Sequence, residues 1–279
     1  MITLVKKPAP ERPLLLAKNI KNMEIFIISL TAFFVAILTF FSGFGLGTIL
    51  TPVFMVFFPV DLAIALTGVV HFFNNIFKLF LVGKKSDTEV LIKFGVPAVL
   101  FALLGSWLML KMTDWKPLFA YEAFGKEFEV YPVKFTVSMV LIIFASMDLI
   151  PYFQKLQFGK EKLPIGGALS GFFGGLSGNQ GALRSAFLIK AGLSKEAFVG
   201  TAVVVSTFVD FTRLSVYATR FLNTSLIDNI QLVSIATISA ILGAYIGNKL
   251  LKKVTLKFLQ FTVAIMLILI SIALGAGWI

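Results

Sequence analysis

The chain has 279 residues, of which 58% are hydrophobic and only 14% are charged, and its mean hydropathy is +0.93. This composition excludes an ordinary soluble domain and indicates an integral membrane protein. The net charge of +11 comes from short basic clusters between apolar segments, where Lys and Arg hold loops at lipid headgroups. Because no basic stripe is interleaved with aromatic residues, we expect a lipid bilayer and no nucleic acid as partner. The chain has no cysteine, which excludes disulfides and thiolate-bound metals.

The N-terminal segment 1–23 is basic and contains three prolines, which predicts a cytoplasmic or interfacial tail. A cleavable signal peptide is not expected. The apolar region that follows is several times longer than a signal core, and it lacks a small-residue cleavage pattern.

The first apolar segment is too long for a single membrane span. No charged side chain lies between Glu24 and Asp61, and a straight helix over this stretch would extend roughly 54 Å, against about 30 Å of hydrocarbon. We therefore expect a break within residues 42–52, where a helix is easiest to interrupt. The residues that favour the break are Gly43, Gly45, Gly47 and Pro52.

The remaining apolar segments predict helices, because a lone strand cannot satisfy its backbone hydrogen bonds in lipid. In chain order, the expected spans and half-spans are 25–42, 48–58, 62–82, 94–110, 133–150, 164–189, 197–221, 229–248 and 258–278. Within 164–189 the polar run Ser177-Gly178-Asn179-Gln180-Gly181 predicts a second break. Between two of the spans, Tyr121 to Val130 fits either a small hairpin or a surface helix.

The two halves of the chain follow one plan, and internal duplication is common in secondary transporters. Ser42-Gly43 aligns with Ser177-Gly178, and residues 102–105 resemble 240–243. We predict an all-α integral membrane protein with two four-helix repeats, each opening with a glycine-broken or re-entrant helix. The expected divisions are repeat one at 24–150, a basic linker at 151–163 and repeat two at 164–279. Basic residues are almost equally numerous on alternate loops, so parallel and inverted repeats are both compatible with the sequence.

Polar side chains at membrane depth are costly and therefore indicate function. His71, Asn75 and Lys78 lie on one face of the second expected span, together with Asn74. We expect Asn75 to contact the substrate, and His71 and Lys78 to serve coupling or gating. The alternative for Lys78 is snorkelling from the end of the span.

The corresponding span of the second half carries Ser206, Asp210, Arg213 and Tyr217 on one face, with Thr207 beside it. We expect Asp210 and Arg213 to serve coupling or gating and Thr207 to orient the substrate. Two alternatives stay open: Asp210 and Arg213 as a structural ion pair, and Arg213 as a snorkelling side chain.

Arg184 is the most informative single residue. It is the only charge between Leu163 and Ile189, and a guanidinium cannot lose its proton to avoid the cost of burial. The helix that starts after the second break also presents free N–H groups and a positive dipole end. We therefore expect Arg184 to bind an anionic substrate; pairing with Asp210 across the bundle is the alternative. The other expected substrate-binding residues around the two breaks are Asn179, Gln180, Ser177, Gly178, Gly43, Gly45, Gly47 and Thr48.

Three stretches resemble the sulfite exporter TauE/SafE family of membrane permeases: Gly43-Phe44-Gly45-Leu46-Gly47 running to Pro52, Ala63 to Thr67, and Gly171 to Gly181. The similarity covers about residues 25–279. The resemblance implies a duplicated four-plus-four helix bundle in the cell membrane. It also implies transport of small anions such as sulfite, sulfoacetate, other organosulfonates or carboxylates. Asn179-Gln180 departs from the family pattern in a place that could alter the substrate.

The expected function is therefore secondary transport of a small anion by alternating access, without a cofactor. The coupling ion is a proton, carried by His71 or Asp210, or sodium held by backbone carbonyls. Two competing functions are an anion channel and a membrane-embedded enzyme. The enzyme would need the single histidine to pair with Ser177 or Ser206.

Overall fold

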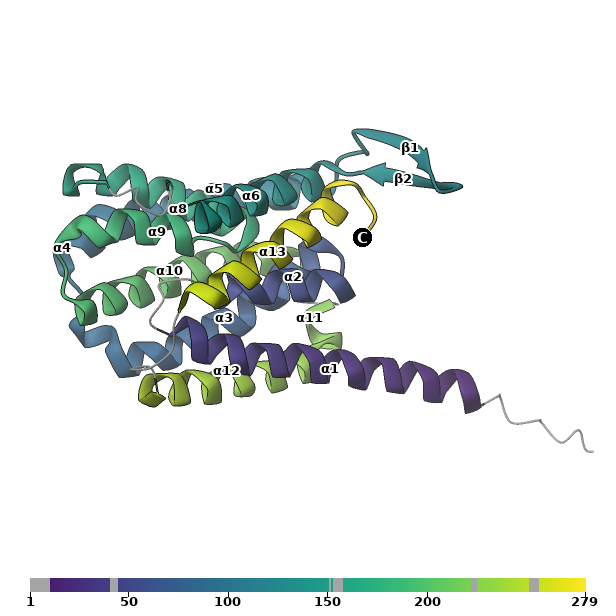
Figure 1. Ribbon diagram of the computed structural model, residues 1–279, viewed down its shortest axis with the longest axis horizontal. Helices are drawn as coiled ribbons and strands as arrows, with labels where there is room; N and C mark the ends of the chain where they lie inside the picture. Colours follow the sequence, from purple (N-terminus) through teal and green to yellow (C-terminus); the bar gives the residue numbers. More distant parts are fainter. Residues whose placement is uncertain (1–10, 41–44, 151, 153–157, 222–224, 251–255) are drawn as a thin grey trace, which may run out of the picture.

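A computed structural model describes residues 11–40, 45–150, 152, 158–221, 225–250 and 256–279, and most of them are helical (Figure 1). The helices of the first half are α1 (Glu11–Thr39), α2 (Gly47–Phe57), α3 (Val60–Val82), α4 (Thr88–Val90), α5 (Val96–Thr113) and α6 (Pro132–Leu149). The helices of the second half are α8 (Leu163–Ser177), α9 (Gly181–Leu188), α10 (Lys195–Phe221), α11 (Ser225–Asp228), α12 (Ile230–Leu250) and α13 (Leu256–Gly275). Short 3-10 turns occupy Gly83–Lys85, Lys160–Lys162 and Ile189–Ala191, and a π-helical turn at Leu91–Gly95 joins α4 to α5.

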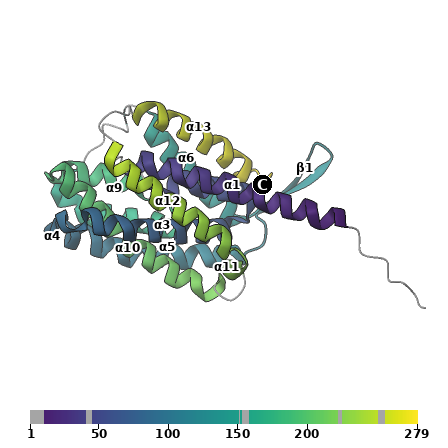
Figure 2. The same cartoon turned by 90° about the horizontal axis from the view of Figure 1, so that it is seen from below.

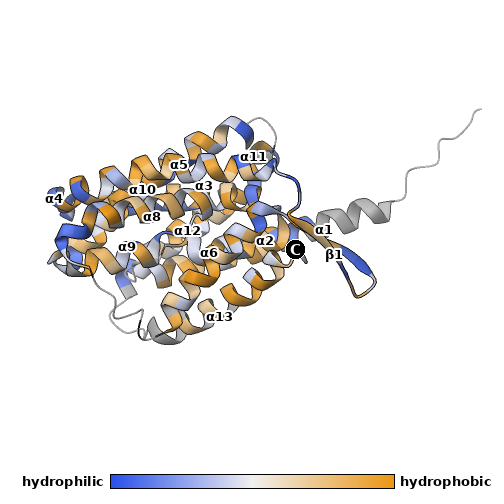
Figure 3. Ribbon diagram, turned by 90° about the horizontal axis from the view of Figure 1, so that it is seen from above, coloured by the Kyte–Doolittle hydropathy of each residue, from blue (hydrophilic) through white to orange (hydrophobic). Residues whose placement is uncertain are grey.

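Five of the described helical segments are long and apolar enough to cross a membrane: Lys21–Thr39, Val60–Lys85, Thr88–Thr113, Lys195–Arg220 and Ile230–Lys249. Apolar residues predominate along the lengths of the helices, and polar residues gather towards the two ends of the bundle (Figure 3). The expected all-α, multi-pass membrane protein is confirmed. The first span differs in extent from the prediction, because α1 starts at Glu11 and includes residues assigned to the basic tail.

Both predicted helix breaks are confirmed where the structure describes them, but Gly47 and Pro52, which were expected to favour the first break, lie inside α2. α1 ends at Thr39 and α2 begins at Gly47, while Gly43 lies outside the described residues. The second break lies between the end of α8 at Ser177 and the start of α9 at Gly181. Gly178 adopts a φ of 75° there, a left-handed conformation that glycine reaches without strain.

The segment between α5 and α6 forms a hairpin, which decides between the two structures expected for it. Strands β1 (Phe119–Ala123) and β2 (Lys126–Val130) are antiparallel, and the turn residues Phe124 and Gly125 have φ values of 54° and 69°. The C-terminus packs beside this hairpin, since the Tyr121 hydroxyl donates to the Ala276 carbonyl at 2.7 Å. The end of α13 therefore lies at the hairpin end of the bundle (Figure 1).

Glycines bring two pairs of parallel helices into backbone contact. A Cβ added at Gly167, Gly171 or Gly175 of α8 would overlap the carbonyl groups of Phe94, Ala98 and Ala102, the last two on α5. In the same way, Gly243 and Gly247 of α12 lie against the backbone of α1, and Figure 2 shows these two helices side by side. Close packing through small residues explains these glycines.

Gly171→Ala is expected to destabilise the protein by about 1–3 kcal/mol, because the added methyl would force α5 and α8 apart. Thermal unfolding in detergent measures the loss. Gly83→Ala is the matched control: its φ is −60°, and the nearest atom to an added Cβ, at 3.1 Å, is Cδ2 at the end of the Leu79 side chain. Equal unfolding temperatures for the two variants would contradict the proposed close packing.

Two other helix pairs are antiparallel. Gly200, near the start of α10, lies against Val82 at the end of α3, and the Asp87 N–H donates to Thr201 Oγ1 at 2.9 Å. Gly275, at the end of α13, lies against Ser138 near the start of α6. The α3–α10 pair crosses the middle of the protein and carries the buried polar side chains.

Candidate functional site

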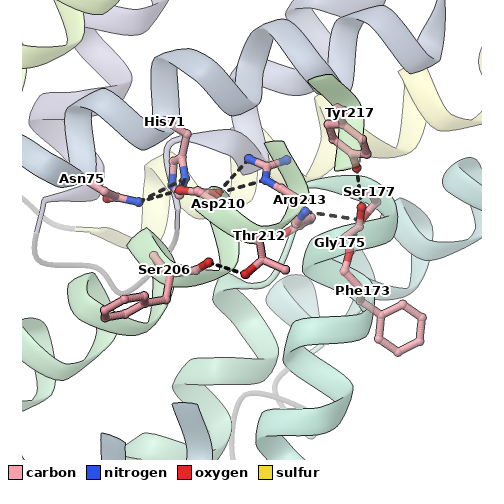
Figure 4. A network of polar contacts seen from close by, with 12 residues as sticks. His71, Asn75, Phe173, Gly175, Ser177, Ser206, Asp210, Thr212, Arg213 and Tyr217 are labelled. Carbon is pink, nitrogen blue, oxygen red and sulfur yellow. Dashed lines mark hydrogen bonds and ion pairs between the residues drawn. The ribbon is translucent and has the colours of Figure 1, made fainter. Parts of the chain in front are cut away.

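The polar faces of α3 and α10 meet inside the protein, as Figure 4 shows. His71 Nδ1 lies 2.6 Å from Asp210 Oδ2, and Asn75 Nδ2 donates to the same oxygen at 3.0 Å. On the other side of the carboxylate, Arg213 Nε donates to Asp210 Oδ1 at 3.0 Å. Asp210 is fully buried and therefore requires these partners.

The structure describes the contacts and the exposure of the charged residues on this face. Asp210 and Arg213 form the expected i, i+3 ion pair, with 2.9 Å between Arg213 Nη2 and Asp210 Oδ1. The snorkelling alternative is wrong, because only 5% of Lys78 and 1% of Arg213 are exposed. A charge held this deep is paired or serves a polar cavity.

A cavity of about 30 Å³ lies next to this network. It is lined by Thr39, Phe40, Gly45, His71, Asn75, Lys78, Arg184, Phe198, Val199, Ala202, Val203 and Ser206. Among these described residues, Lys78 and Arg184 are basic and none carries a carboxylate. Such a cavity favours an anion.

Arg184 reaches the cavity from the short helix α9, and its Nη1 donates to Ser206 Oγ. Lys78 reaches it from α3, with its ammonium 5.3 Å from the centre of the Phe40 ring. Arg184 is 3% exposed. The two cations thus converge from different halves of the chain on one desolvated space, where electrostatic interactions are stronger than in water.

The two helix breaks face each other inside the protein. Thr48 Oγ1 donates to Asn179 Oδ1 at 3.1 Å, which joins the start of α2 to the second break. A Cβ on Gly47 would lie 3.0 Å from the carbonyl oxygen of Gly178, so the backbones approach closely. Gly45, within the first break, lines the cavity, and a Cβ there would be 3.1 Å from His71 Nε2.

Several expected substrate-binding residues make contacts elsewhere. Ser177 Oγ donates to the Phe173 carbonyl and accepts from the Asn179 N–H, so it stabilises its own break. Gln180 packs against Gly174 of α8. Thr207 Oγ1 donates to the Val203 carbonyl of its own helix. Of the described residues in and just after the second break, Arg184 lines the cavity.

Sequence reasoning did not assign a substrate-binding role to Ser206, nor to the apolar wall formed by Phe198, Val199, Ala202 and Val203. Ser206 lies one turn before Asp210 on the polar face of α10, and this position is the feature of the sequence that indicates a role for it. The wall residues resemble ordinary lipid-facing or packing positions in the sequence. Only the close packing of α10 against α3 shows that they border a cavity.

The catalytic arrangement that a membrane-embedded enzyme would need is not formed by the described residues. His71 Nδ1 contacts Asp210, Ser177 Oγ contacts the backbone of its own segment, and Ser206 Oγ accepts from Arg184. No group of three or more metal-ligating carboxylates and imidazoles occurs in the described part of the chain either.

Comparisons with known proteins give one match. No curated protein and no solved structure matches the chain. A family model described as Sulfite exporter TauE/SafE matches residues 28–274, nearly the whole sequence. The chain therefore belongs to the sulfite exporter TauE/SafE family of membrane proteins.

Proposed function

We propose that the protein is a secondary transporter that binds a small oxyanion in the cavity between Arg184 and Lys78. The observation that carries the proposal is the convergence of these two buried cations on a space whose described lining holds no carboxylate. Asn75 and Ser206 add polar groups that can orient oxygens. The family is one of membrane transporters of sulfur anions, in agreement with this chemistry.

The size of the cavity favours sulfite over longer organosulfonates. A single water needs roughly 10–15 Å³ on this measure, so about 30 Å³ accommodates an ion of a few heavy atoms. Two cations also match an oxyanion that carries up to two negative charges.

Alternating access is supported by the helix directions. In the proposed duplication, α3 corresponds to α10 and α6 to α13, and each of these pairs is antiparallel. The parallel contact of α1 with α12 has its counterpart in the parallel contact of α8 with α5. Two repeats inserted in opposite orientations produce this pattern, and they provide two equivalent conformations with opposite access.

Coupling would act through His71, which lines the cavity and also contacts Asp210. We propose a proton as the coupling ion, because this imidazole and carboxylate are linked directly to the anion site.

Binding to purified protein tests the proposed substrate. Sulfite is expected to raise the unfolding temperature under oxygen-free conditions. At a sulfite concentration one hundred times Kd, the free energy of unfolding should increase by about 2.7 kcal/mol. Sulfoacetate and taurine are expected to give smaller shifts at equal concentration. Choline, a cation, serves as the control and should give none. Stabilisation by choline with no effect of any anion would contradict the proposal.

A further inference from the structure

A second group of buried donors lies on the far side of the His71–Asp210 contact from the cavity. Along α3, Thr67 and Lys78 are 11 residues apart, roughly 16 Å along the helix axis, with His71 between them. Along the antiparallel α10, Arg213 is on the Thr67 side of Asp210 and Ser206 is on the Lys78 side. The two polar regions are thus in series across the protein.

Three donor atoms of this second region lack a hydrogen-bond partner among the described residues: Arg213 Nη1, Thr51 Oγ1 and Thr67 Oγ1. Their side chains are at most 1% exposed. A buried donor without an acceptor costs about 1–3 kcal/mol. A ligand that supplies acceptor oxygens would remove that cost.

Arg213 Nη1 and Thr51 Oγ1 lie where the two helix breaks touch, and the methyl group of Thr67 borders the same place. A Cβ on Gly178 would lie 2.8 Å from Arg213 Nη1 and 3.6 Å from Thr51 Oγ1. A Cβ on Gly47 would lie 3.9 Å from both Thr51 Oγ1 and Thr67 Cγ2. The two glycines leave room for these three side chains to approach the breaks, and Gly178 adopts a left-handed backbone in the same turn.

We propose that Arg213, Thr51 and Thr67 form a second oxyanion station, which the substrate occupies after it passes the His71–Asp210 contact. The inference rests on the proposed transport of a small oxyanion. The Asp210 carboxylate separates two cationic regions, Lys78 with Arg184 on one side and Arg213 on the other. An anion meets electrostatic repulsion between the stations and attraction at each of them, which is the requirement for stepwise passage.

The two stations also correspond under the proposed duplication. Lys78 is seven residues after His71 on α3, and Arg213 is seven residues after Ser206 on α10. Each cation lies beside a helix break: Lys78 lines the cavity together with Gly45, and Arg213 contacts Gly178. In an inverted repeat, equivalent groups serve access from opposite sides of the membrane.

The test is uptake of radiolabelled sulfite by right-side-out and inside-out membrane vesicles from the same cells. Thr51→Val with Thr67→Val is expected to raise the half-saturating concentration about 10-fold in one vesicle type and to leave it unchanged in the other. Ser206→Ala, in the cavity lined by Lys78 and Arg184, is expected to raise the half-saturating concentration in the opposite vesicle type. The variant Thr51→Ser with Thr67→Ser keeps both hydroxyls and should have the wild-type half-saturating concentration in both vesicle types. Thr212→Val is the matched control, because that hydroxyl already donates to the Phe208 carbonyl at 2.8 Å.

Two results would overturn the second station. One is a double valine variant with wild-type half-saturation on both sides, which would leave the hydroxyls only a packing role. The other is an equal change on both sides, or a change on the same side as that caused by Ser206→Ala. Absence of saturable sulfite uptake by the wild-type protein in both vesicle types would instead refute the proposed function, so the two failures are distinguishable.

Discussion

Arg184→Gln is expected to lower sulfite uptake at subsaturating concentration by about 30-fold or more. The guanidinium is 3% exposed and lines the cavity, and removal of one partner from a desolvated charge pair costs about 2–5 kcal/mol. Glutamine keeps hydrogen-bonding capacity and much of the volume, so the change isolates the charge. Initial rates of labelled sulfite uptake into proteoliposomes measure the effect.

The matched control for this substitution is Arg220→Gln. Arg220 lies near the end of α10 and pairs with Asp114 at 2.8 Å, with more than a third of its side chain exposed. It should transport sulfite at the wild-type rate. If Arg184→Gln retained full anion affinity while folding normally, the role given to Arg184 would be wrong.

Asp210→Asn is expected to destabilise the protein by about 3–5 kcal/mol. The neutral amide would leave Arg213 buried without its counter-charge, and breaking a buried pair from one side is costly. It would also lose the carboxylate that His71 and Asn75 share. Chemical unfolding in detergent, followed by tryptophan fluorescence, measures the loss.

A double variant separates this explanation from a general defect at position 210. Asp210→Asn with Arg213→Gln removes both charges and should recover part of the lost stability, because no uncompensated charge remains. Asp114→Asn, at the exposed pair with Arg220, should change stability little. Additive losses in the double variant would argue against the ion pair as the main stabilising contact.

Much of the fold was predictable because the lipid bilayer limits helix length. An uncharged segment too long for one span had to break, and the glycines around Gly45 and Gly178 mark the positions. The helical polar face that holds His71, Asn75 and Lys78 was also evident from spacing alone. The helix breaks and this polar face depend on the local sequence and on the lipid bilayer. They can therefore be predicted without knowledge of tertiary contacts.

The composition of the site was less predictable, because it depends on how distant helices pack. Asn179 and Arg184 are five residues apart, yet one bonds to Thr48 and the other donates to Ser206. The antiparallel packing of α10 on α3 brings Asp210 to His71 across 139 positions of sequence. The sequence does not decide between a hairpin and a surface helix at Tyr121 to Val130 for a similar reason, since the contact of this segment with the C-terminal Ala276 is long-range.

The most direct test of the central claim is counterflow in proteoliposomes. Vesicles loaded with unlabelled sulfite and diluted into a trace of labelled sulfite should accumulate label transiently above the equilibrium level, because a carrier exchanges one bound anion for another. The overshoot should disappear with Arg184→Gln. Flux that rises linearly with sulfite concentration, without overshoot and with unitary currents in planar bilayers, would show an anion channel and contradict the account.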